Sequence, residues 1–183
     1  MRLFTAIDLP ADLVATLDRV IATLRPSARL KWSEASNLHI TLKFVGEWRE
    51  QRLDELKAVL RELPKYPPTP VHVRKLGFFP NPHSPRVFWA GIEAASDLGA
   101  LARDADRALA ALGVASEQRA YSPHLTLARI KERVPMQPLR ESIAGLPSLD
   151  FGSFIADRFY LYHSRLSPSG SVYTKLAEFA LSG

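Results

Sequence analysis

The chain has no cysteine among its 183 residues. This excludes disulfide bonds, thiolate catalysis and any zinc or iron–sulfur site with cysteine ligands. No uninterrupted apolar run approaches the roughly 18 residues that a membrane span needs. Near the start, Asp8 and Pro10 interrupt the apolar residues too early for the core of a signal peptide. We therefore expect a soluble, cytoplasmic protein that does not interact with a membrane.

Several motifs of common enzyme classes are also missing. No Gly-rich phosphate loop follows the first expected strand, and there is no Gly-x-Ser-x-Gly sequence that would mark a serine nucleophile. The histidines lack the His-x-x-x-His spacing of a zinc site. The formal net charge of +5 favours an anionic partner such as nucleic acid, although a solvated basic surface explains it equally well.

A short duplication is the most informative feature that is present. The tetrapeptide His-Ile-Thr-Leu at 39–42 recurs as His-Leu-Thr-Leu at 124–127. Residues i and i+2 of a β-strand point to the same face, so each copy presents an imidazole beside a hydroxyl. A single His-x-Thr is usually a half-buried strand position, but two copies favour one site built from both. The candidate catalytic residues are His39, Thr41, His124 and Thr126.

The repeat extends beyond these tetrapeptides. Residues 2–7 resemble 86–92, and an amphipathic helical pattern follows each segment, at 13–24 and 98–112. Each half then reaches its His-x-Thr strand and a further helix. The expected elements are strands at 38–45, 71–76, 123–130, 154–161 and 172–181, and later helices at 53–63 and 139–146.

The mixture of strands and helices predicts an α+β fold with antiparallel sheets, and a doubly wound nucleotide fold is the less favoured alternative. The length allows one domain or two small lobes that share a core. We expect a single domain over 1–183 with approximate repeats at 1–80 and 86–183. Because this internal two-fold builds the site within one chain, we expect a monomer.

Two imidazoles with two hydroxyls suit in-line displacement at phosphorus. Histidine has an unperturbed pKa of about 6.5, so near neutrality one ring can hold a proton while the other lacks it. A neutral histidine removes a proton from the attacking oxygen, and a protonated one delivers a proton to the leaving oxygen. Threonine hydroxyls can hold the phosphate in line. This chemistry requires no metal or cofactor, and we expect none.

These residues resemble the two-histidine phosphoesterase superfamily, and more narrowly its LigT-like branch, the RNA 2′,3′-cyclic phosphodiesterases, also known as 2′-5′ RNA ligases. The resemblance covers nearly the whole chain. It includes Arg-Leu-Phe-x-Ala-Ile at 2–7, Asn37 to Gly46, Phe-Pro-Asn at 79–81, Pro-His-Leu-Thr-Leu-Ala-Arg at 123–129 and Ser-x-Leu-x-Pro-x-Gly-x-x-Tyr at 164–173.

The resemblance implies a bilobal fold with a pseudo-two-fold axis, in which helices flank antiparallel sheets and the active cleft lies between the lobes. It also implies that His39 is the proton donor and His124 the proton acceptor in hydrolysis of 2′,3′-cyclic ends to 2′-phosphomonoesters. The residues themselves give the pair but not this order. Thr41 and Thr126 would orient the phosphate.

Three further residues are candidates for substrate binding. By alternation Lys43 shares the face of His39 and Thr41, where it could meet an RNA phosphate as well as solvent. Arg129 matches the family motif but points away from His124 in a regular strand, so a bulge or strand end is needed to bring it round. Tyr121 stands where an aromatic Phe is commoner and could stack on a base, although packing is the usual role of such a ring.

Two alternative functions use the same residues differently. If an RNA 5′-hydroxyl replaces water, the site joins tRNA halves as a 2′-5′ RNA ligase. The protein could instead be a non-catalytic RNA-binding module, but pure binding gives no reason for two intact His/Thr pairs. In every case the expected partner is RNA or a nucleotide, with a 2′,3′-cyclic phosphate end for the enzyme.

Overall fold

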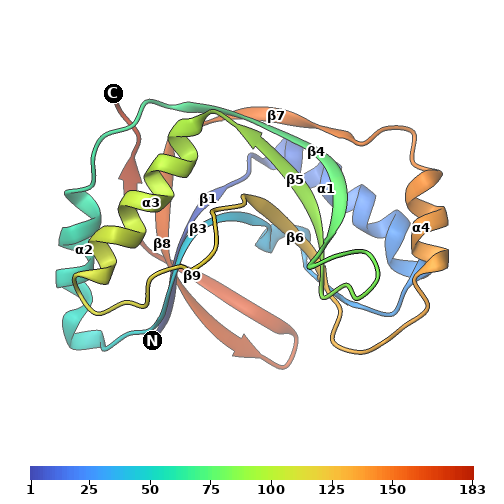
Figure 1. Ribbon diagram of the computed structural model, residues 1–183, viewed down its shortest axis with the longest axis horizontal. Coiled ribbons are helices and arrows are strands. Elements are labelled where there is room, and N and C mark those ends of the chain that lie inside the picture. The colour runs from blue at the N-terminus through green and yellow to red at the C-terminus, as the bar shows by residue number, and fades with distance from the viewer.

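Two antiparallel β-sheets lie side by side in the computed structural model, which describes residues 1–183 (Figure 1). Sheet A has the order β3 (His39–Glu47), β1 (Arg2–Asp8), β8 (Arg158–Ser167) and β9 (Gly170–Ala180). Sheet B has the order β2 (Lys31–Trp32), β6 (His124–Arg129), β5 (Val87–Ala94), β4 (Thr69–Phe79) and β7 (Asp150–Ala156). Every neighbouring pair is antiparallel. The α+β fold with two antiparallel sheets is confirmed, and the doubly wound alternative is wrong.

Four α-helices cover the sheets: α1 (Ala11–Leu24), α2 (Leu53–Arg61), α3 (Ser96–Ala110) and α4 (Gln137–Ala144). Short 3₁₀ turns occupy η1 (Arg25–Ser27), η2 (Ala35–Asn37) and η3 (Glu50–Arg52). The first three α-helices bury apolar residues at helical spacing, for example Leu13, Leu17 and Ile21 in α1, whereas α4 buries only Leu139. None of the helices is long and apolar enough to cross a membrane.

The first helix of each sequence half covers the sheet that contains the other half's His-x-Thr strand. α1 follows β1 of sheet A but packs against β7 of sheet B and against α4. α3 follows β5 of sheet B but packs against β3 of sheet A and against α2. Figure 1 shows the pairs α2/α3 and α1/α4 at opposite ends of the molecule. Residues 1–80 and 86–183 therefore both contribute to both lobes, which share one buried apolar cluster of 36 residues.

One expected strand is divided in the structure. The apolar stretch 154–161 is not a single strand: β7 ends at Ala156 in sheet B and β8 begins at Arg158 in sheet A. Asp157 stands between them, and its carbonyl accepts a hydrogen bond of 2.8 Å from the backbone N–H of Leu181. The apolar pattern continues across the break because both strands are partly buried, so periodicity alone could not show that the chain changes sheets.

Candidate active site

The two His-x-Thr strands lie next to each other where the sheets meet, with β3 at the edge of sheet A in contact with β6 of sheet B. The local geometry of the histidines is the same. Nδ1 of His39 lies 2.7 Å from the carbonyl oxygen of Asn37, and Nδ1 of His124 lies 2.8 Å from that of Ser122. A carbonyl only accepts, so Nδ1–H is the donor in both rings. Nε2 of each ring is left to exchange protons.

The threonines are held by their main chain. The carbonyl of Thr41 accepts a hydrogen bond of 2.8 Å from the hydroxyl of Tyr121, and that of Thr126 accepts one of 2.8 Å from Ser33 Oγ. Each bond joins the strand to a loop of the other sequence half. Because no protein group bonds to either threonine hydroxyl, both hydroxyls are available for a phosphate oxygen.

A β-bulge follows each His-x-Thr motif at the equivalent place. Thr5 pairs with Lys43 but the next residue of β1 pairs with Thr41, so one residue is inserted in β3. In the β5–β6 pair, Phe88 pairs with Ala128 but the next residue of β5 pairs with Thr126, so one residue is likewise inserted in β6. The inserted residues are Leu42 and Leu127. Such a bulge reverses the side-chain alternation beyond it.

The bulge in β3 overturns the expectation for Lys43. Lys43 does not share the face of His39 and Thr41, because its side chain turns into the protein and is only 6% exposed. Its Nζ lies 2.6 Å from Oδ1 of Asp106 and 2.7 Å from the carbonyl oxygen of Ala115. Lys43 therefore joins β3 to α3 and to the segment after it, where it cannot meet an RNA phosphate.

The bulge in β6 has the opposite consequence for Arg129. It turns Arg129 to the face of His124, and the side chain is exposed. Its charge is near enough to lower the pKa of His39. Phe44 occupies the equivalent position in β3, where its ring is exposed. The equivalent position after the bulge therefore carries a cation in β6 and an aromatic ring in β3.

Tyr121 is packed against the apolar core rather than presented as a free ring. Burial raises the pKa of its hydroxyl, which is occupied by the Thr41 carbonyl. This arrangement indicates that Tyr121 positions the Thr41 strand.

The two histidines have different neighbours. The ring of His39 lies between Phe4 and Tyr173, with centroid distances of 4.8 and 5.3 Å. Burial is the main influence on its pKa and lowers it, and the charges of His124 and Arg129 act in the same direction. The hydrogen bond to Asn37 and the negative charge of Asp8 oppose this and raise the pKa.

Asp8, which the sequence motif did not reveal, is the cross-strand partner of His39. Its carboxylate accepts a hydrogen bond from the hydroxyl of Tyr162 and lies 2.6 Å from Nζ of Lys175. These contacts come from β8 and β9, which lie more than 140 residues further along the chain. No local sequence pattern could assign them.

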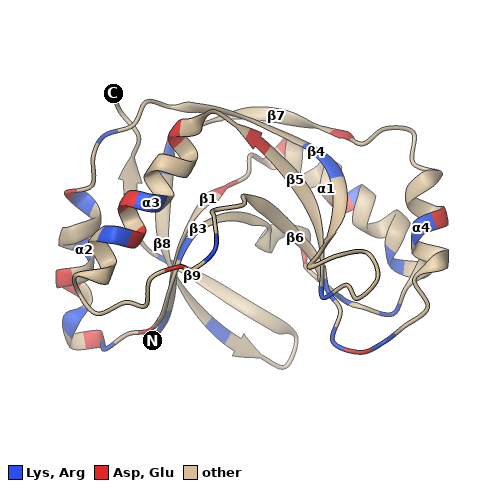
Figure 2. Ribbon diagram, in the orientation of Figure 1, with Lys and Arg blue, Asp and Glu red and all other residues tan.

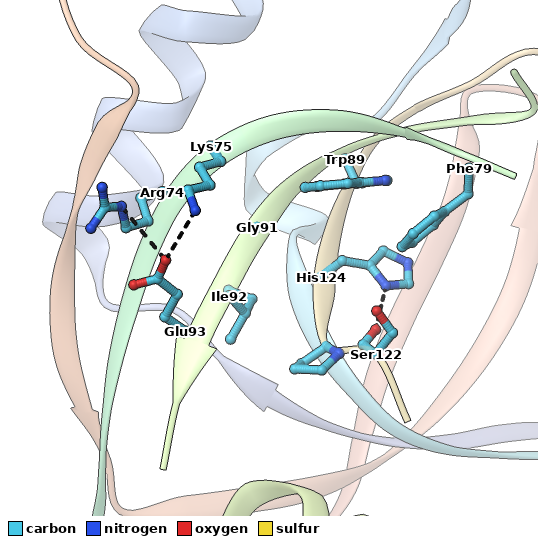
Figure 3. A pocket seen from close by; sticks show the side chains of 10 residues that line it. Arg74, Lys75, Phe79, Trp89, Gly91, Ile92, Glu93, Ser122 and His124 are labelled. Carbon is cyan, nitrogen blue, oxygen red and sulfur yellow. Dashed lines mark hydrogen bonds and ion pairs between the residues drawn. The ribbon is translucent and has the colours of Figure 1, made fainter. Parts of the chain in front are cut away.

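The surroundings of His124 are more open. Phe79 packs edge-on against its ring at 5.1 Å, and Trp89 lies against Phe79 at the same centroid distance (Figure 3). A cavity of about 240 Å³ adjoins this cluster. Its wall also contains Arg74, Lys75, Gly91 and Glu93.

Paired histidine and threonine side chains on neighbouring strands, with an exposed cation beside them, are the residue types expected of a two-histidine phosphoesterase. The chain belongs to the 2′-5′ RNA ligase superfamily, whose family model matches residues 10–167. It is accordingly an enzyme, a phosphodiesterase.

The comparisons with individual proteins cover nearly the full length. The chain is 36% identical over 99% of both chains to an RNA 2′,3′-cyclic phosphodiesterase of Methanothermobacter thermautotrophicus. It is 32% identical to one of Thermotoga maritima, covering 100% of this chain and 97% of the relative. Among solved structures, E. coli LigT complexed with 3′-AMP is similar with a TM-score of 0.80 and 27% identity, over 100% of this chain and 98% of the other.

Proposed function

We propose that the protein hydrolyses 2′,3′-cyclic phosphate ends of RNA to 2′-phosphomonoesters by acid–base catalysis with its two histidines. The relatives named RNA 2′,3′-cyclic phosphodiesterase support the reaction. The observation that carries the mechanism is the matched pair of Nδ1–H bonds to the carbonyls of Asn37 and Ser122. These bonds fix both rings in the same tautomer and orientation, with Nε2 free in each.

In the proposed step, Nε2 of His124 removes a proton from a water molecule. The water oxygen attacks phosphorus, and the bond to the 3′ oxygen breaks. Nε2 of His39 gives its proton to that oxygen. Burial lowers the pKa of this ring, and the negative charge of Asp8 offsets part of that effect. The hydroxyls of Thr41 and Thr126 bind the non-bridging oxygens together with Arg129. Each histidine is expected to contribute roughly 10²–10⁴-fold to the rate.

The experiment is product analysis with a short RNA that ends in a 2′,3′-cyclic phosphate, in the presence of EDTA. The expected product is the 2′-phosphate, with turnover unaffected by the chelator. A 3′-phosphate product, or turnover that EDTA abolishes, would overturn the proposal.

Alanine variants distinguish this enzyme from an RNA-binding module. His39→Ala and His124→Ala should each lose roughly 10²–10⁴-fold in turnover while RNA binding is retained. His83→Ala is the matched control, because His83 lies on an exposed loop and is not part of a His-x-Thr pair. If His39→Ala and His124→Ala keep the wild-type rate, the acid–base assignment is wrong.

A further inference from the structure

The backbone around the two histidines is equivalent, but the position opposite each one is filled differently. Asp8 lies opposite His39, with its carboxylate occupied by Tyr162 and Lys175. Gly91 lies opposite His124 in the β5–β6 pair and has no side chain. The cavity of about 240 Å³ opens there. In this pseudo-symmetric site the position beside His39 is therefore occupied by a carboxylate, whereas the position beside His124 opens into a cavity.

The cavity is formed mainly by residues of β4 and β5. Trp89 and Glu93 lie two residues before and after Gly91 in β5, so they stand on the same face and flank the gap. A Cβ atom on Gly91 would lie 2.5 Å from the carbonyl oxygen of Arg74. β4 thus approaches β5 too closely for any side chain at this position.

An irregularity in β4 turns two cations toward the cavity. Arg74 and Lys75 are consecutive and would point to opposite faces of a regular strand. The register of β4 shifts between Val73 and Leu76, and Lys75 has a positive φ of 70°, which is uncommon for a residue other than glycine. Both side chains consequently line the cavity (Figure 3).

The charges at this end of the cavity are only loosely paired. Arg74 Nε and Lys75 Nζ lie 3.7 and 3.8 Å from Oε1 of Glu93, and all three side chains are about half exposed or more. Figure 2 shows basic residues on β4 and an acidic residue at the arrowhead of β5. Exposed pairs of this kind contribute little to stability. A phosphate, which has more charge and more acceptor oxygens than a carboxylate, can therefore displace Glu93.

We propose that this cavity binds a nucleoside 3′-phosphate unit whose 5′ oxygen takes the place of water beside His124. The inference rests on the proposed function, because it takes His124 as the proton acceptor. Phe79, Trp89 and Pro123 supply apolar surface for the ribose and base. Arg74 and Lys75 supply cations for the 3′-phosphate.

The joining reaction needs no reactant other than the cyclic phosphate and the 5′-hydroxyl. The 5′-hydroxyl loses its proton to His124, its oxygen bonds to phosphorus, and the bond to the 3′ oxygen of the cyclic phosphate breaks. That 3′ oxygen takes the proton of His39, and a 2′-5′ phosphodiester results. In the reverse direction the same cavity holds the departing nucleoside. The rate of cleavage of a 2′-5′ linkage therefore measures binding in the cavity.

The test compares two 2′-5′-linked adenosine dinucleotides, one with a 3′-phosphate on the departing nucleoside and one without. The measured quantity is the ratio of their kcat/KM values. For the wild type we expect a preference of about five- to tenfold for the phosphorylated dinucleotide, the size of a partly exposed charge-assisted contact. Lys75→Gln should bring the ratio close to one. Glu93→Gln should raise it, because the competing carboxylate is removed.

Arg61→Gln is the matched control, since it removes one positive charge from an exposed position on α2, away from the site. It should leave the ratio at the wild-type value. Hydrolysis of 2′,3′-cyclic AMP is measured with the same wild-type preparation.

The two proposals fail separately. If the wild type does not hydrolyse 2′,3′-cyclic AMP, the proposed function is overturned. If it does, but cleaves neither dinucleotide, shows a ratio near one, or keeps its preference in Lys75→Gln, the acceptor subsite alone is overturned.

Discussion

Asp8 and His39 are direct cross-strand partners in the β1–β3 pair, and the carboxylate of Asp8 raises the pKa of the histidine against the effect of burial. The equivalent partner of His124 is Gly91, which has no charge. This difference breaks the near two-fold symmetry of the site. Asp8 offsets part of the effect of burial, which still leaves the pKa of His39 below its ordinary value.

Asp8→Asn should test which histidine is the acid. Removing the carboxylate lowers the pKa of His39, so less of it is protonated at any given pH above that pKa. If His39 is the acid, kcat/KM for a 2′,3′-cyclic nucleotide falls on the alkaline side and stays unchanged on the acidic side. The measurement is kcat/KM from pH 5 to 9 for the variant and the wild type.

The opposite assignment gives an opposite result. If His39 were the base, Asp8→Asn would raise kcat/KM on the acidic side and leave the alkaline side unchanged. Asp18→Asn on the exposed face of α1 removes the same charge away from the site, and its profile should match the wild type.

Arg129→Gln should reduce catalysis without affecting folding. The side chain is exposed on the histidine face, so its loss leaves no buried group unpaired. A charge-assisted bond to phosphate contributes roughly 1.5–3 kcal/mol, which corresponds to a fall of about 10–100-fold in kcat/KM. This fall in kcat/KM, with an unfolding curve like that of the wild type, would show that Arg129 acts on the substrate and not on the fold. An unchanged kcat/KM would remove Arg129 from the site.

Lys43→Met should show the reverse pattern. The change leaves the carboxylate of Asp106 and the carbonyl of Ala115 without their shared donor at a position that is 6% exposed. We expect the free energy of unfolding in urea to fall by about 2–3 kcal/mol. The folded fraction should keep nearly its full kcat/KM, and a large loss of activity without loss of stability would contradict the structural role. Lys57→Met on α2 is the control.

The sequence predicted the helices and strands of this fold better than it predicted which of them pack together. Apolar periodicity located the four helices and the two His-x-Thr strands, because a helix or strand signals its buried face locally. It could not show that α1 and α3 exchange sheets, since an amphipathic helix buries the same stripe against either sheet. The sequence match between 2–7 and 86–92 aligns Phe4 with Phe88. In the structure Phe4 pairs with Phe44, whereas Phe88 pairs with Ala128, one residue before the equivalent of Phe44. The structural equivalence of the two strands is therefore shifted by one residue from the sequence match.

At the site, the duplicated motif led to the histidines and threonines, but alternation misplaced the residues beyond it. The bulge-forming residues Leu42 and Leu127 are apolar and buried, as regular strand residues at those positions would be. Nothing in their identity marks the inserted position. Lys43 was consequently assigned to the wrong face, and Arg129 needed the bulge that only the structure supplies.

Tyr121→Phe and Ser33→Ala form a matched pair that tests how the threonines are positioned. Each removes the one hydroxyl that bonds to a threonine carbonyl, Thr41 in the first case and Thr126 in the second. Each should lower the free energy of unfolding by about 1 kcal/mol, the usual contribution of a neutral hydrogen bond. If these bonds hold the phosphate-binding hydroxyls in place, kcat/KM should fall severalfold in both variants while the pH profile keeps its shape, because neither hydroxyl exchanges a proton with substrate. A loss of stability with kcat/KM unchanged would show that the two bonds support the fold alone, and a shifted pH profile would show that they act on the histidines instead.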